Sequence, residues 1–146
     1  MQVSTKFTIS LHILVAVEFF SESNKITSDF LSGSIGANPV IIRNLLGDLK
    51  KVGILEVKRG TGGITLKRPL SEISFLDIYR SVETTGVENL FHFHEKPNQK
   101  CPVGRNIKKS LDDDLKEIQQ KFEEELSKHK VADIYEKTLS EIKSEN

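Results

Sequence analysis

Apolar and polar positions alternate at helical spacing along the first part of the chain. A helix over residues 5–20 is predicted by apolar residues that recur every three or four positions: Phe7, Leu11, Leu14, Val15 and Phe19. After a polar loop, Thr27 or Ser28 can cap a short helix, because a hydroxyl oxygen accepts a hydrogen bond from an N–H of the first turn. The pattern therefore predicts two helices before residue 37.

A third helix and a hairpin are predicted next. Asparagine and proline open a helix over residues 38–52, and the glycine that follows ends it. Two runs with strand character, 54–58 and 64–67, flank a tip at 59–63 that contains three glycines. Two short helices, a turn and a hairpin within about forty residues are typical of a winged helix-turn-helix.

The second half of the chain is predicted to be helical, with one interruption. A capping-box pattern at Ser74 begins a helix that reaches about residue 83, and the residues up to 109 lack clean periodicity. The helix predicted over 110–126 is charged except for a narrow apolar stripe: Leu111, Leu115, Ile118, Phe122 and Leu126. Such a stripe indicates a helix that faces a partner, although it could instead pack on its own domain.

The predicted fold class is therefore mostly α with a small β-hairpin. It comprises a winged helix-turn-helix domain for DNA binding over residues 1–83, a connector or sensor loop over 84–109, and a helical dimerisation region over 110–146 that includes the long C-terminal dimerisation helix.

Composition agrees with a globular protein and charge divides the chain. The 146 residues are 37% hydrophobic and 29% charged, and the apolar run over 9–20 contains Ser10, His12 and Glu18, which make it too polar to span a bilayer. The N-terminus lacks the pattern of a secretory signal, so we expect a cytoplasmic protein. Residues 1–70 carry a net charge of +4 and residues 71–146 a net charge of −4, which suggests that the halves have different roles.

Residue types at the start of the third helix are those that read DNA bases. Arg43 can offer two parallel donors to guanine, and Asn44 can pair with adenine. The candidate DNA-binding residues lie on this helix, the wing and the preceding helix: Ser28, Asn38, Val40, Arg43, Asn44, Lys58, Arg59 and Thr61. Each feature has an ordinary alternative, since Arg43 could be a solvated helix residue and the glycine run a plain hairpin turn.

Four segments resemble the Rrf2 family of bacterial transcriptional regulators: residues 38–46, 49–55, 58–69 and 72–79. The likeness is dense over 1–83 and follows the layout beyond, although Ile64 stands where the family often has Tyr. It implies a winged-helix homodimer on a near-palindromic double-stranded operator, with each long C-terminal helix crossing to the partner. It also implies that Arg43 and its neighbours read bases while Arg59 enters the minor groove.

The best-known members of that family bind an iron–sulfur cluster through three cysteines in the connector. This chain has only Cys101, so we expect no such cofactor; a mixed site with His92, His94 and Glu95 is the remaining alternative. Residues 97–104 resemble the clusterless branch, in which one cysteine lies near the dimer interface. Cys101 is either a thiol switch, favoured by nearby cations and a helix N-terminus if the long helix begins near residue 103, or a small buried residue without a role.

No catalytic or metal-binding arrangement appears in the sequence, so we do not expect an enzyme. Asp112, Asp113 and Asp114 point in different directions on a helix, and they suit its first turns better than a metal site. The prediction is a sequence-specific DNA-binding regulator, most simply a repressor. The alternatives are a protein-interaction module on a winged-helix scaffold and a regulator that senses a ligand in a pocket at the dimer interface.

Overall fold

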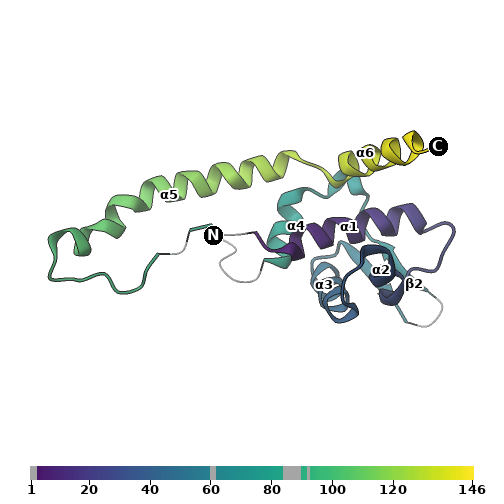
Figure 1. The fold of residues 1–146 in the computed structure, drawn as a ribbon, viewed down its shortest axis with the longest axis horizontal. Coiled ribbons are helices and arrows are strands. Elements are labelled where there is room, and N and C mark those ends of the chain that lie inside the picture. Colours follow the sequence, from purple (N-terminus) through teal and green to yellow (C-terminus); the bar gives the residue numbers. More distant parts are fainter. Residues whose placement is uncertain (1–2, 60–61, 84–89, 92) are drawn as a thin grey trace.

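Six α-helices and one hairpin make up the part of the chain that the computed structural model describes, residues 3–59, 62–83, 90–91 and 93–146 (Figure 1). The elements are α1 (Thr5–Phe20), α2 (Ser28–Ile35), α3 (Pro39–Lys51), β1 (Leu55–Lys58), β2 (Gly63–Leu66), a 3-10 turn η1 (Leu70–Glu72), α4 (Phe75–Val82), α5 (Pro102–Lys128) and α6 (Val131–Ser144). The mostly α fold class with a small hairpin is confirmed.

Helix α1 lies at the centre of the packing. It contacts α2, α4, α6 and β2, so it is covered on several sides rather than along one stripe. Its buried residues are Ser10, Ile13, Leu14, Ala16 and Val17, whereas Phe19 on the predicted face is exposed. The single-stripe prediction fails here because neighbours cover α1 on several sides, and the face with Thr8, His12 and Phe19 stays exposed.

Caps fix the helix-turn-helix as the sequence predicts. The Thr27 hydroxyl accepts from the Phe30 N–H at 3.0 Å, and the Asn38 side chain accepts from the Val40 N–H at 2.7 Å. Gly36, with φ of 76°, ends α2 in the left-handed conformation that glycine adopts without steric cost. The buried side of α3 packs against α2, α4 and β1: Ile42, Leu45, Leu46 and Leu49.

The wing is a two-stranded antiparallel hairpin, and it is tied to the segment before α2. Val57 pairs with Ile64 and Lys58 with Gly63. The Ile64 N–H donates to the carbonyl oxygen of Ile26 at 2.9 Å, across a gap of almost forty residues in sequence. A Cβ at Gly63 would lie 2.9 Å from that same carbonyl oxygen, so glycine is needed where the two segments meet.

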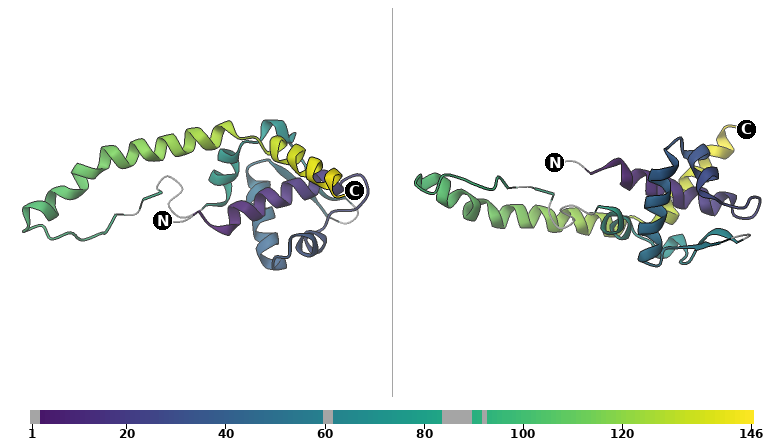
Figure 2. Two further views of the ribbon diagram at one scale, coloured as in Figure 1. Left: turned by 45° about the horizontal axis from the view of Figure 1, so that its top comes forward. Right: turned by 90° about the horizontal axis from the view of Figure 1, so that it is seen from below.

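The C-terminal helices return to the winged-helix domain at a short backbone bridge. The Phe75 N–H donates to the His129 carbonyl at 2.9 Å, and the Val131 N–H donates to the Ile73 carbonyl at 3.0 Å. Val131 is fully buried, and α6 packs along α1 and η1 (Figures 1 and 2). The last helix of the predicted dimerisation region therefore covers its own domain.

The long helix begins earlier than the sequence pattern predicts, at Pro102 rather than at Ser110. Proline suits the first helical position, where its missing N–H costs nothing, but Gly104 obscured the helical pattern. Position 104 has no room for a side chain, because a Cβ there would collide with the carbonyl oxygen of Asn98. The first turns of α5 are thus packed by the connector that precedes them.

None of the helices in the described part of the chain is long and apolar enough to cross a membrane.

The capping box at the start of α4 gives a stability prediction. Ser74 is buried; its hydroxyl accepts from the Asp77 N–H at 3.1 Å, and its N–H donates to the Asp77 carboxylate at 2.9 Å. Ser74→Ala should lower the free energy of unfolding by about 1 kcal/mol, since it removes the acceptor for that N–H. Urea titration measures the loss. The control Ser71→Ala, on the exposed side of η1, should stay within about 0.5 kcal/mol of the parent, and an equal loss in both variants would contradict the role of the cap.

Candidate nucleic-acid interface

A groove of about 400 Å³ opens between the segment before α2, the exposed side of α3, and the hairpin. Its floor is apolar, from Leu46, Val57 and Ile64. Four cationic side chains line it: Lys25, Arg43, Lys50 and Lys58. None of the described residues that line it carries a carboxylate. A concave surface with one sign of charge concentrates anions, so the groove suits a polyanion.

The four cations reach the groove from three different parts of the chain. Arg43 and Lys50 lie seven residues apart on α3, with Gly47 between them, so the three share one side of the helix. Lys58 ends β1 opposite Gly63. The hydrogen bond between Ile64 and Ile26 brings Lys25 to the same groove from a distant part of the sequence.

The groove brings together three of the residues predicted from the sequence to bind DNA: Ser28, Arg43 and Lys58. Two of the cations that line the groove, Lys25 and Lys50, were not among the residues predicted from the sequence. Lys50 could have been found from its helical spacing to Arg43. Lys25 carries no such signal, because only the tertiary contact between Ile64 and Ile26 places it there.

The exposed start of α3 lies beside the groove. Val40 is 55% exposed, and Arg43 and Asn44 are also exposed, so these side chains are available to an outside partner. The side-chain oxygen of Asn38 caps the helix, which leaves its amide nitrogen as the donor it can present.

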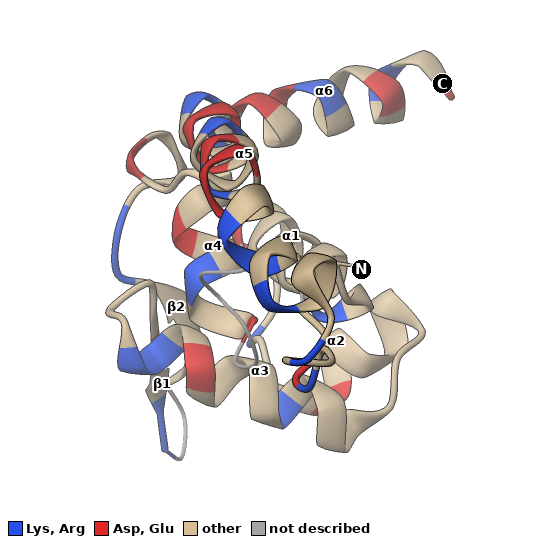
Figure 3. Ribbon diagram, turned by 90° about the vertical axis from the view of Figure 1, so that its left-hand side faces the viewer, with Lys and Arg blue, Asp and Glu red and all other residues tan. Residues whose placement is uncertain are grey.

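The hairpin extends the positive surface. Lys58 and Arg59 are exposed, and Figure 3 shows Lys and Arg in blue from the end of β1 toward the tip of the hairpin. The predicted contact Thr61 lies outside the described residues.

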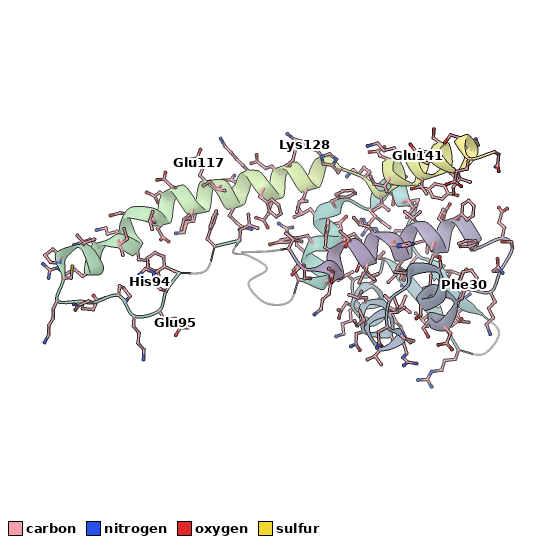
Figure 4. The ribbon with its side chains drawn as sticks, in the orientation of Figure 1. Phe30, His94, Glu95, Glu117, Lys128 and Glu141 are labelled. Carbon is pink, nitrogen blue, oxygen red and sulfur yellow. The ribbon has the colours of Figure 1, made fainter. Side chains whose placement is uncertain are left out.

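The predicted interface stripe on α5 divides into two parts. Toward the C-terminal end, Phe122 packs edge-to-face on Tyr79 of α4, with ring centroids 5.5 Å apart. Leu111 and Ile118 are 37% and 48% exposed, and the N-terminal part of α5 leads away from the winged-helix domain (Figure 4). The alternative that the stripe packs on its own domain therefore describes Phe122, while the exposed residues still lack cover within the described chain.

A buried polar contact joins α5 to α4 and the connector. Gln119 is buried, and its side-chain oxygen accepts from the Leu90 N–H. Burial raises the pKa of the Tyr79 phenol above its usual value, and interaction with the Gln119 side chain opposes part of that rise. On the surface above, Arg80 pairs with Glu123 at 3.5 Å. These contacts fix the C-terminal half of α5 relative to the winged helix.

The connector forms a second pocket, also of about 400 Å³, against the start of α5. Phe93 and His94 stack with their ring centroids 4.5 Å apart, and Arg105 and Lys108 line the α5 side (Figure 4 labels His94). This is the place at which a small molecule could bind under the ligand-sensing alternative.

Cys101 stands at the junction of connector and helix. It occupies the N-cap position of α5 and is half-buried. Its N–H donates to the Asn98 carbonyl at 3.2 Å, and its own carbonyl accepts from the Arg105 N–H at 3.0 Å. A change at the sulfur would therefore act where the connector passes into the long helix.

Comparison with known proteins agrees with this architecture. A family model described as Rrf2, iron-dependent transcriptional regulator, matches residues 3–137. A Bacillus subtilis (strain 168) protein named "Putative HTH-type transcriptional regulator YwnA" is 35% identical over 132 residues, which are 90% of this chain and 96% of YwnA.

The chain belongs to the Rrf2 family.

Solved structures share the fold of this Rrf2 protein. One, described as "a putative DNA binding protein", is 29% identical with a TM-score of 0.68, over 88% of this chain and 97% of the other. The structure of Bacillus subtilis CymR, named the global cysteine regulator, is 18% identical with a TM-score of 0.66, over 93% and 97% of the two chains. The family model and these relatives are named as regulators and binding proteins rather than enzymes, which agrees with the prediction from sequence.

The donor groups of this Rrf2 protein do not fit an iron–sulfur cluster, despite the description of the family. Such a cluster takes four ligands, most often thiolates, and each chain contains one cysteine. Within the described residues, no three His, Cys, Asp or Glu side chains gather closely enough to hold a metal. His92, part of the mixed-ligand alternative, lies outside the described residues.

Proposed function

We propose that this Rrf2 protein is a sequence-specific DNA-binding transcriptional repressor, which acts as a homodimer on a near-palindromic operator. The observation that carries the proposal is the groove lined by four cations beside the exposed start of α3. DNA presents phosphates to such a surface and base edges to a helix that enters its major groove. Repression is the simplest consequence, because a bound dimer covers the promoter sequence beneath it.

Each element would have its own part in recognition. Val40, Arg43 and Asn44 on α3 present an apolar contact, a two-donor fork and an amide, which suit thymine, guanine and adenine in the major groove. Lys58 and Ser28 lie in the groove, where they would hold phosphates. Arg59, at the hairpin, would reach the neighbouring minor groove.

The uncovered part of α5 supports the proposed homodimer. Val103, Leu111 and Ile118 are 69%, 37% and 48% exposed, on a helix that extends from the rest of the chain (Figure 1). A second copy presents the same stripe, and two such stripes can cover one another about a two-fold axis. A two-fold dimer would set its α3 helices about 34 Å apart, one turn of DNA, which matches a palindromic site.

Cys101 would supply the signal. Its thiolate attacks a peroxide oxygen, the O–O bond breaks, and the leaving hydroxide takes up a proton, which yields a sulfenic acid and water. The added oxygen would sit at the N-cap of α5, where Asn98, Cys101 and Arg105 are linked through the backbone. A disturbance there would alter how α5 is held and thus the spacing of the two winged helices.

DNA recognition is tested at Arg43. An operator is first selected from random DNA with the parent protein, and binding is followed by fluorescence anisotropy. Arg43→Ala should weaken operator binding by about 1–3 kcal/mol, since one bidentate base contact is lost. Lys137→Ala removes an equal charge from the exposed side of α6 and should leave affinity unchanged. Equal operator affinity for Arg43→Ala and the parent would remove Arg43 from base reading, and failure to select any sequence would overturn the proposed function.

Dimerisation is tested at Ile118 by sedimentation. The parent should sediment at twice the 16.5 kDa mass of the chain, and Ile118→Asp at that mass, because a carboxylate in an apolar interface is left unpaired. Gln120→Asp adds the same charge at an exposed polar position of α5 and should remain dimeric. A dimeric Ile118→Asp would contradict the α5 interface.

The thiol switch is tested with hydrogen peroxide. Treatment should add one oxygen atom to Cys101, seen by mass spectrometry, and should weaken operator binding by the parent at least several-fold. Cys101→Ser should bind the operator before and after treatment with the same affinity. The switch is contradicted if Cys101 reacts no faster than in the unfolded chain, or if peroxide weakens the parent and Cys101→Ser alike.

A further inference from the structure

Gly47 occupies the middle of α3, where glycine is costly. An interior helical glycine is less stable than alanine because its backbone loses more freedom on folding. Gly47 has none of the usual structural reasons to be glycine. Its φ is not in the left-handed region, where Gly36, Gly53 and Gly63 lie, and a Cβ at Gly47 would meet no heavy atom within 4 Å.

Three other glycines have a visible steric reason in the free chain. A Cβ at Gly63 would collide with the Ile26 carbonyl, one at Gly62 with the Lys58 side chain, and one at Gly104 with the Asn98 carbonyl. At Gly47 the space is open and belongs to the groove, between Arg43 one turn before and Lys50 one turn after. Nothing in the structure of the free chain therefore requires glycine at position 47.

We propose that Gly47 is a clearance position, at which one strand of the DNA backbone lies against α3 between Arg43 and Lys50. The inference rests on the proposed DNA binding and adds to it a contact site for the sugar–phosphate backbone. Lys50 neutralises a phosphate of that strand, while Arg43 passes beside the strand to the base that it reads. The missing side chain at position 47 lets the sugars of the strand approach the apolar floor formed by Leu46, Val57 and Ile64. Any side chain there would hold the strand away from Lys50 and from that floor.

If the DNA backbone contacts α3 at Gly47, the substitution Gly47→Ala should stabilise the protein and weaken DNA binding. The midpoint of thermal unfolding should rise by about 2–4 °C, because alanine favours the helix and meets no neighbour. The dissociation constant for the selected operator should increase at least tenfold. Affinity for DNA of scrambled sequence should fall by a similar factor, because phosphate contacts carry no sequence information.

Gly33 provides the matched control. It lies in α2, its Cβ would likewise meet no heavy atom within 4 Å, and it does not line the groove. Gly33→Ala should raise the thermal midpoint to a similar extent and leave both dissociation constants within twofold of the parent. The measurements are differential scanning fluorimetry and fluorescence anisotropy on the full-length chain.

The outcomes separate this inference from the proposed function. If the parent protein binds no DNA, the proposed function and the role of Gly47 are both overturned. If the parent binds and Gly47→Ala binds equally well, only the clearance role is overturned. It is also overturned if Gly33→Ala loses as much affinity, or if Gly47→Ala weakens the operator alone, since the position would then face a base. A raised midpoint with weaker binding to both DNAs, confined to position 47, supports it.

Discussion

The hydrogen bond from the Ile64 N–H to the Ile26 carbonyl holds the functional surface of this protein together. It joins the hairpin to the segment that leads into α2, and so closes one side of the groove against α3. It holds Lys25, before α2, beside Lys58 of the hairpin, and β1 in turn packs against α3, which carries Arg43. Gly63 makes this contact possible, because a side chain there would collide with the same carbonyl oxygen.

The two ends of helix α5 have different surroundings. Near its C-terminal end, Phe122 and Gln119 pack against Tyr79 of α4 and connect the helix to the DNA-facing domain. Near its N-terminal end, Val103 and Leu111 are exposed and the connector packs around Gly104, and Ile118 is exposed on the side of the helix away from Gln119. One rigid helix can therefore carry a change at Cys101 or at the proposed dimer interface to the winged helix, since a continuous run of backbone hydrogen bonds links the two ends.

Stability and proposed function act in opposite directions at α3. The side of the helix toward the core is filled by Ile42, Leu45 and Leu49, whereas the side toward the groove contains a glycine that lowers helix stability. Val40 leaves apolar surface in water for the same proposed reason. Such local departures from what favours folding are expected where a surface is shaped for a partner absent from the free protein.

The sequence by itself determined the local structure: the caps at Thr27, Asn38 and Ser74, the hairpin, and the order of elements that defines a winged helix-turn-helix. These features depend on residues close together in the chain, so periodicity and capping patterns reveal them. Only the tertiary structure decided that Lys25 joins the groove, that α1 is covered on several sides, and that Phe122 packs inward while Ile118 does not. Those outcomes depend on contacts between distant segments, and a one-dimensional pattern gives the side of a helix on which a residue lies but not what covers it.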